Sequence, residues 1–193
     1  MRPLPFVWPY ALVFWAVEFW AFYPEFKVLR GAKRTGNAKD AKSLQVILFG
    51  LNFAFLTAFF VAWLPILQIV NNRVAVFVLG IALMICGSLL RRYCFRALGQ
   101  SFTGDVRASP DQKVISTGPY SLVRHPSYSA AIILNSGLAL ALGSWASLII
   151  LLVVSIVVYS YRISVEERAL VTTIGEPYRE FMRSRKRLIP YLY

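Results

Sequence analysis

Five long apolar segments with few charges dominate this 193-residue chain. A helix of about 20 apolar residues is enough to cross the hydrocarbon core of a bilayer. An apolar content of 58% and a mean hydropathy of +0.57 exclude an ordinary soluble globular domain. The pattern predicts an all-α integral membrane protein that forms a single membrane domain over 1–193. The expected spans are 4–23, 44–66, 73–90, 127–142 and 145–161.

The basic residues gather in alternate connections between these segments. Of the 21 Lys and Arg residues, all but Arg2 and Arg73 fall in 24–43, 91–124 and the part from 162 onward. This alternation follows the positive-inside rule for five spans with the N-terminus outside and the C-terminus in the cytosol. We therefore expect the net charge of +12 to face anionic lipid headgroups rather than nucleic acid. The expected membrane is the plasma membrane of a prokaryote or the endoplasmic reticulum of a eukaryote.

The sequence divides into an anchoring part, 1–90, and a working part, 91–193. The third span should continue as a helix to Leu98, before a loop rich in Gly and Pro. Only Gly143-Ser144 separate the last two spans, so these should form a tight hairpin. Small residues along the fourth span favour close approach of a neighbouring helix.

Chemically capable residues concentrate around His125, the single histidine of the chain. The residue before a proline favours extended backbone, and proline favours the first turn of a helix. The fourth span should therefore begin at about Pro126, with His125 as its cap. The amides of Ser127, Tyr128 and Ser129 are then expected to be free to bind an anion at the cytosolic rim.

A second group of polar residues follows the fifth span. Arg162 and Glu166 are four residues apart and share a helix face, whereas Glu167 is turned by about 100°. Because the hairpin is tight, this face returns to the level at which the fourth span begins. We expect His125, Tyr128, Arg162 and Glu166 to be neighbours at a cofactor pocket on the cytosolic face. Such residues are also common as satisfied surface groups, so this pattern alone leaves catalysis open.

The usual fingerprints of soluble cofactor and metal sites do not occur. The sequence has no GxGxxG run, P-loop, zinc-ligand spacing or Ser-His-Asp order. One histidine cannot build a histidine-based metal site, so we predict no metal.

A series of short motifs in the working part resembles a known family. The motifs are Gly118-Pro119-Tyr120, Arg124-His125-Pro126-Ser127-Tyr128, Glu166-Glu167, Leu170, Gly175, Tyr178 and Pro190. In this order and spacing they resemble the isoprenylcysteine carboxyl methyltransferase family, and the related membrane phospholipid methyltransferases share much of the pattern. The resemblance covers about 90–193. The RHPxY element alone is less specific, because membrane sterol reductases have a similar one.

The resemblance implies S-adenosyl-L-methionine as the cofactor, with S-adenosylhomocysteine as its product. Arg162 matches the arginine assigned to the substrate. Asp105 and Arg107 are weaker candidates for site residues. Methyl transfer to a carboxylate needs a dry site and a held nucleophile rather than a base. An amine nucleophile would need a proton acceptor, for which Glu167 is the obvious spare carboxylate. The implied cofactor contacts are Gln112, Lys113, Val114, Ile115, Tyr120, His125, Pro126, Ser127, Tyr128 and Glu166.

Several functions stay open at this point. The favoured substrate is a lipophilic or prenylated carboxylate, and the first alternative is the amine of a phospholipid. A membrane reductase that uses NADPH on a sterol-like lipid shares the RHPxY element, but would need more spans. A non-catalytic membrane scaffold is the remaining alternative. The sequence does not indicate an oligomeric state.

Overall fold

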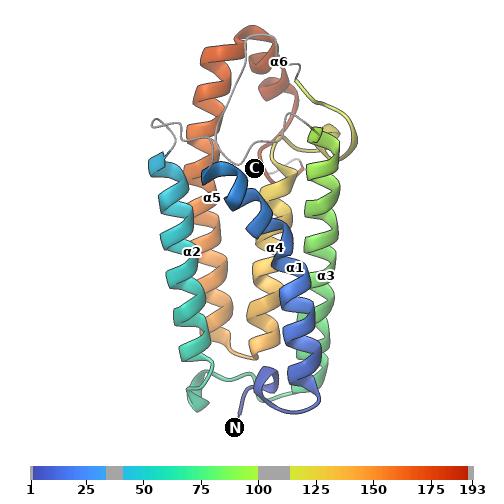
Figure 1. Ribbon diagram of the computed structural model, residues 1–193, viewed down its shortest axis with the longest axis vertical. Helices are drawn as coiled ribbons and strands as arrows, with labels where there is room; N and C mark the ends of the chain where they lie inside the picture. The colour runs from blue at the N-terminus through green and yellow to red at the C-terminus, as the bar shows by residue number, and fades with distance from the viewer. Residues whose placement is uncertain (1, 34–40, 100–113, 191–193) are drawn as a thin grey trace.

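The computed structural model of the protein describes residues 2–33, 41–99 and 114–190, and in these ranges its regular elements are all helices. Two isolated β-bridges, Gln68 with Ser144 and Val123 with Lys186, are the remaining pairings described. In chain order the elements are η1 (Leu4–Phe6), α1 (Tyr10–Lys33), α2 (Ala41–Val61), η2 (Pro65–Leu67), α3 (Arg73–Leu98), η4 (Gly118–Ser121), α4 (Pro126–Leu142), α5 (Trp145–Ile174) and α6 (Glu176–Ser184) (Figure 1).

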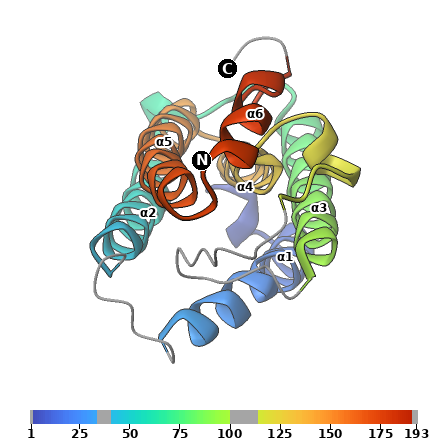
Figure 2. The same ribbon diagram turned by 90° about the horizontal axis from the view of Figure 1, so that it is seen from above.

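The helix α4 lies at the centre of the bundle. It packs against α3 on one side and against α5 on the other, and α2 lies against the far side of α5 (Figure 2). The helix α1 crosses α3 and α4 at an angle (Figure 1). Helices of the anchoring part therefore pack directly on helices of the working part.

Glycines allow α3 and α4 to approach closely. A Cβ atom added to Gly137 would lie 2.6 Å from the backbone nitrogen of Met84, and one on Gly87 would lie 2.7 Å from that of Leu134. Real side chains do not tolerate such distances, so the contact requires residues without a Cβ. The prediction that the fourth span permits close packing is confirmed.

Single polar pairs join the helices at other points. The Asn135 amide in α4 donates to the Ser155 hydroxyl in α5 at 2.9 Å, and both side chains are buried. The Ser147 hydroxyl in α5 donates to the carbonyl of Ala58 in α2 at 2.7 Å. Each pair satisfies groups that an apolar environment would otherwise leave unpaired.

Three helices of the described residues, α2 from Ser43, α3 and α5, are long and apolar enough to cross a membrane, and α4 is a shorter apolar helix. The all-α membrane fold is confirmed. That the chain has five spans, and that its N-terminus lies outside, stay predictions. The first expected span is displaced: α1 begins at Tyr10 rather than at 4, because prolines at 3, 5 and 9 supply no amide for an earlier helix. It also continues to Lys33, so part of the expected loop 24–43 is helical.

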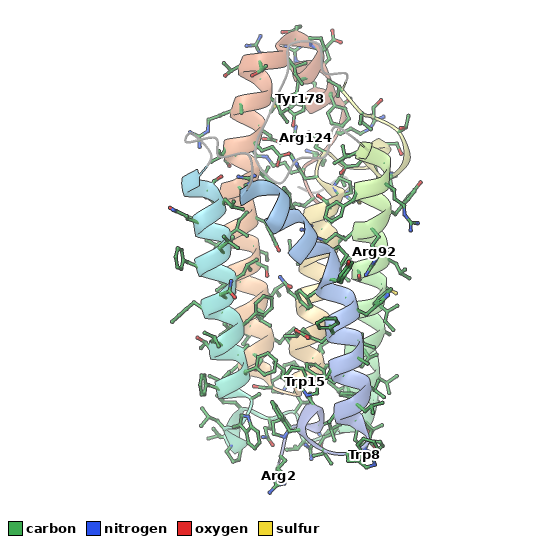
Figure 3. The ribbon with its side chains drawn as sticks, in the orientation of Figure 1. Arg2, Trp8, Trp15, Arg92, Arg124 and Tyr178 are labelled. Carbon is green, nitrogen blue, oxygen red and sulfur yellow. The ribbon has the colours of Figure 1, made fainter. Side chains whose placement is uncertain are left out.

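The two ends of the bundle differ in character. Arg2 and Trp8 lie at one end, whereas Arg124 and Tyr178 lie at the other, where α5 extends beyond the other helices (Figure 3). We call the second the charged end: Arg91, 118–129, 159–167 and 178–188. We call the packed segments 50–88 and 130–158 the apolar body. The helix α5 ends at Ile174, before Gly175, whose positive φ of 78° favours glycine.

Candidate active site

The turn before α4 has the conformation that its Gly and Pro residues favour. Gly118 begins the 3₁₀ helix η4 with a φ of 59°, and Pro119 lies in its first turn. His125 is the N-cap of α4, and Pro126 occupies the first turn, as predicted. This geometry directs the His125 ring inward, where it is only 5% exposed.

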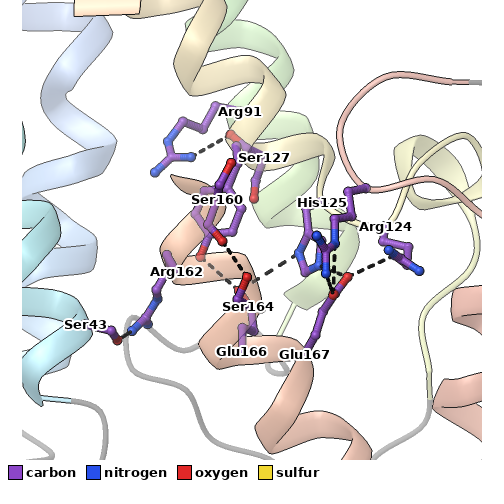
Figure 4. A network of polar contacts seen from close by, with 12 residues as sticks. Ser43, Arg91, Arg124, His125, Ser127, Ser160, Arg162, Ser164, Glu166 and Glu167 are labelled. Atoms are coloured by element: carbon purple, nitrogen blue, oxygen red, sulfur yellow. Dashed lines mark hydrogen bonds and ion pairs between the residues drawn. The ribbon is translucent and has the colours of Figure 1, made fainter. Parts of the chain in front are cut away.

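The His125 ring lies beside both acids of the Glu166-Glu167 pair. Its Nε2 atom is 3.2 Å from Oε1 of Glu167, and its Nδ1 atom is 4.0 Å from Oε2 of Glu166. The first contact is a hydrogen bond, whereas the second is too long to be one. The imidazole therefore connects the start of α4 with the extension of α5 (Figure 4).

Tyr128 completes the predicted juxtaposition. Its hydroxyl donates to Oε2 of Glu166 at 2.9 Å, and its ring stacks on Tyr159 at a centroid distance of 5.2 Å. Arg162 also interacts with the Tyr128 hydroxyl. The prediction that His125, Tyr128, Arg162 and Glu166 are neighbours is confirmed by these contacts.

Arg162 connects this group with α2. Its side chain is 4% exposed, and its Nη1 atom donates to the hydroxyl of Ser43, which is also buried. Figure 4 shows Arg162 pointing toward Ser43, on the opposite side of α5 from His125 and Arg124. The sequence did not indicate Ser43, because nothing in its local pattern points to a partner 119 residues away.

Glu167 is the centre of a separate ionic cluster. Its Oε2 atom accepts hydrogen bonds from Nε and Nη2 of Arg187, at 3.1 and 2.8 Å. Its Oε1 atom accepts from His125 and lies 3.0 Å from Nε of Arg124, an ion pair without hydrogen-bond geometry. The prediction of a spare carboxylate is wrong, because both oxygens have cationic partners and the side chain is 4% exposed.

The segment after α6 lies against the start of α4. The backbone amides of Arg124 and His125 donate to the carbonyls of Lys186 and Arg187, at 2.8 and 2.9 Å. The Ser129 hydroxyl donates to the carbonyl of Leu188 at 2.6 Å. We call 186–188 the C-terminal clasp, and the sequence did not predict it.

The other predicted cofactor contacts differ in burial and in hydrogen bonding. Tyr120 is buried, and its hydroxyl has no hydrogen-bond partner among the described residues, although the Ser127 side chain lies close by. Burial raises the pKa of the Tyr120 phenol, so the group stays protonated and can donate. The Ser127 carbonyl accepts from Nη1 of Arg91 at 2.7 Å, and Pro126 is buried. Val114 and Ile115 are half-buried.

Some expectations are corrected or lie outside the described residues. The amides of Tyr128 and Ser129 both donate to the His125 carbonyl, at 3.1 and 3.4 Å, so the prediction that they are free is wrong. The cap residue itself turns its carbonyl toward the first turn of the helix. Gln112 and Lys113, and the weaker candidates Asp105 and Arg107, lie outside the described ranges.

The chain is similar to known proteins in both sequence and fold. A family model described as Phospholipid methyltransferase matches residues 75–176, which is just over half of the chain. Protein-S-isoprenylcysteine O-methyltransferase B of Arabidopsis thaliana is 30% identical over 115 residues, which is 58% of each chain. The protein-S-isoprenylcysteine O-methyltransferase of Schizosaccharomyces pombe is 32% identical over 108 residues, 55% of this chain and 46% of its own.

The chain spans about half the length of the curated relatives it matches. Among solved structures, the eukaryotic intramembrane Ras methyltransferase ICMT (isoprenylcysteine carboxyl methyltransferase) aligns with a TM-score of 0.63 and 23% identity. This alignment covers 73% of the present chain and 52% of the other, and it supports the membrane fold. The resemblance to the isoprenylcysteine carboxyl methyltransferases is confirmed, and the chain belongs to the phospholipid methyltransferase family.

Proposed function

We propose that the chain is an S-adenosylmethionine-dependent membrane methyltransferase that methylates the carboxylate of a lipophilic, isoprenylcysteine-like substrate. The observation that carries the proposal is the cluster of His125, Tyr128, Arg162 and Glu166 at one end of a bundle of membrane helices. The relatives named as protein-S-isoprenylcysteine O-methyltransferases support the same chemistry. We place the cluster at the cytosolic side, following the charge pattern of the sequence.

The side chains of the charged end suit the cofactor. When bound, S-adenosylmethionine supplies an electrophilic methyl group that a carboxylate oxygen can displace, with S-adenosylhomocysteine as the product. Glu166 is 30% exposed and can accept hydrogen bonds from hydroxyl or ammonium groups of the ligand. The Tyr120 hydroxyl, a buried donor without a described partner, is available to a ligand atom. A buried donor without an acceptor lowers the stability of the protein, so a ligand atom that accepts a hydrogen bond from it would bind favourably.

One arginine of the cluster suits an acidic acceptor. Arg162 interacts with Tyr128, whose hydroxyl donates to Glu166, and a guanidinium can bind a carboxylate through two parallel hydrogen bonds. In the proposed mechanism the planar fork of Arg162 holds the substrate carboxylate, and burial keeps water away from the reacting atoms.

Methylation of a phospholipid amine is the second candidate, because the matching family model carries that description. An amine attacks only after it loses its proton, so the site would need a base. Both oxygens of Glu167 already accept from or pair with cations, and Glu166 accepts from Tyr128. Glu167 is therefore poorly placed to take a further proton, and Glu166 is assigned to the cofactor in this proposal. The carboxylate substrate is therefore the better match.

Methyl transfer to defined acceptors tests the proposal. The purified protein would be incubated with radiolabelled S-adenosylmethionine and an S-farnesyl cysteine derivative with a free carboxylate. The matched control is the same molecule with a carboxamide, and vesicles of phosphatidylethanolamine present the amine. We expect transfer to the acid alone, as an ester from which alkali releases the label. Alkali-stable label on phosphatidylethanolamine alone would overturn the carboxylate assignment.

A further inference from the structure

Glu167 differs from its neighbour Glu166 in what surrounds it. The Glu167 side chain is 4% exposed and contacts the cationic groups of Arg124 and Arg187 and the ring of His125. The Glu166 side chain is 30% exposed and faces Tyr128. A carboxylate enclosed by fixed partners is well suited to hold other groups in place. A ligand would reach Glu166 more readily.

The hydrogen bond between Glu167 and His125 determines which ring nitrogen carries a proton. An ionised carboxylate is only an acceptor, so the Nε2 atom of His125 must donate across the 3.2 Å contact. The Nδ1 atom is then directed toward Glu166 and Tyr128, where the cofactor is proposed to bind. The partner of one ring nitrogen thus decides what the other nitrogen presents.

Arg187 in turn fixes the Glu167 carboxylate. The two hydrogen bonds that Arg187 donates to Glu167 both go to Oε2, which leaves Oε1 for His125 and Arg124. The backbone of Arg187 also accepts a hydrogen bond from the amide of His125 at 2.9 Å. The same residue therefore holds the histidine twice, through its carbonyl and through the carboxylate that bonds to the imidazole.

We propose that Glu167 and Arg187 are positioning residues that keep a proton on Nε2 of His125 and direct its Nδ1 into the cofactor site. They act through His125 and do not touch the reacting atoms. The ligand that His125 meets rests on the proposed function, whereas the state of the imidazole does not. The predicted catalytic role of Glu167 is replaced in this proposal by a positioning role.

Because His125 is the single histidine, nitrogen NMR of the detergent-solubilised protein without a histidine tag reports on it alone. In the wild type we expect a directly observed Nε2–H signal, since a buried, hydrogen-bonded proton exchanges slowly with water. Glu167→Ala should abolish this signal, and Arg187→Ala should shift or broaden it. An unprotonated Nε2 in the wild type, or the same signal in Glu167→Ala, would overturn the proposal. This readout needs no cofactor, so it is independent of the proposed function.

Binding provides the second readout. We expect Arg187→Ala to weaken S-adenosylhomocysteine binding about tenfold, because a hydrogen bond to a charged group is lost from the support of His125. Arg187→Lys should recover part of the affinity and the NMR signal. The matched control is Arg183→Ala, which removes one charge from an exposed arginine of α6 that pairs with Glu176.

The binding outcomes separate the two proposals. Weaker binding in Arg187→Ala, with partial recovery in Arg187→Lys and none lost in Arg183→Ala, supports the positioning role. Unchanged affinity in a folded Arg187→Ala variant contradicts it. If the wild type binds no S-adenosylhomocysteine but keeps its Nε2–H signal, the proposed function fails while the positioning of the imidazole stands.

Discussion

The apolar body and the charged end satisfy their polar groups in different ways. In the apolar body, each bond that we describe between two helices involves a single side-chain donor, as in Asn135 with Ser155 or Ser147 with Ala58. In the charged end, Glu167 alone contacts three cationic or potentially cationic side chains, from two segments far apart in the sequence. Isolated pairs are independent contributions to stability, whereas a network couples distant segments of the chain.

Because of this difference, we expect the two regions to contribute separately to the stability of the fold and to its function. Changes in the apolar body should lower the stability of the fold and leave the ligand affinity of the folded protein unchanged. Changes in the network around His125, Arg162 and Glu167 in the charged end should alter turnover or affinity before they alter stability, whereas changes to exposed side chains of α6 should affect neither. Each prediction below tests one side of this contrast.

The largest expected effect is that of Arg162→Ala on methyl transfer. Loss of the guanidinium that holds the substrate carboxylate should lower kcat/KM by about 10²–10³-fold. Binding of S-adenosylhomocysteine should stay close to wild type, which also verifies that the variant folds. The control is Arg168→Ala, because Arg168 is exposed on α5 and donates to the Ser164 carbonyl of its own helix. An equal loss of cofactor affinity in Arg162→Ala would contradict this assignment.

The next effect is on the stability of the apolar body. Gly137→Leu inserts a side chain where a Cβ alone would lie 2.6 Å from the Met84 backbone. We expect a loss of about 3 kcal/mol, the upper end for overpacked interiors, measured as a lower Tm in detergent. The control, Val78→Leu, enlarges a side chain that is 58% exposed on α3. A Tm equal to that of the control would show that α3 and α4 do not pack as described.

Glu166→Gln should have an intermediate effect on affinity. The amide keeps the shape of the side chain but removes the charge that would accept from the cofactor. We expect binding of S-adenosylhomocysteine to weaken about tenfold with little change in Tm, because charge-assisted hydrogen bonds are the stronger ones. Glu180→Gln, on the exposed side of α6, is the control. If the two variants bind alike, Glu166 is not a cofactor contact.

The smallest effect is expected for Asn135→Ala. Hydrogen bonds between membrane helices contribute on average about 0.6 kcal/mol. The variant loses the bond to Ser155 and should melt slightly lower, with unchanged affinity for S-adenosylhomocysteine. In the control, Asn52→Ala, the lost bond joins the side chain to the Leu48 carbonyl of the same helix. Weaker ligand binding in Asn135→Ala would break the separation between the two regions.

The part of the site that was predictable follows from local rules. Proline at 126 placed His125 at the start of α4, and the four-residue spacing put Arg162 and Glu166 on one helix face. The tight hairpin brought these groups together, as their contacts confirm. A continuous helix beyond the fifth span was also foreseeable.

The unpredicted part depends on contacts between distant segments. Arg187 reaches Glu167 from a segment after α6, and Ser43 meets Arg162 from α2. No periodicity links these positions, because their approach is decided by how whole helices pack. The error about Glu167 has the same origin: a carboxylate appears spare in the sequence when its partners come from elsewhere in the chain.

Calorimetric titration of the detergent-purified protein with S-adenosylhomocysteine tests the central claim most directly, with NADPH as the control ligand. The account predicts saturable, single-site binding of S-adenosylhomocysteine that weakens in His125→Ala and Glu166→Gln, and no binding of NADPH. Binding of NADPH alone, or of neither ligand to a folded sample, would contradict the claim that the charged end is a methyl-donor site.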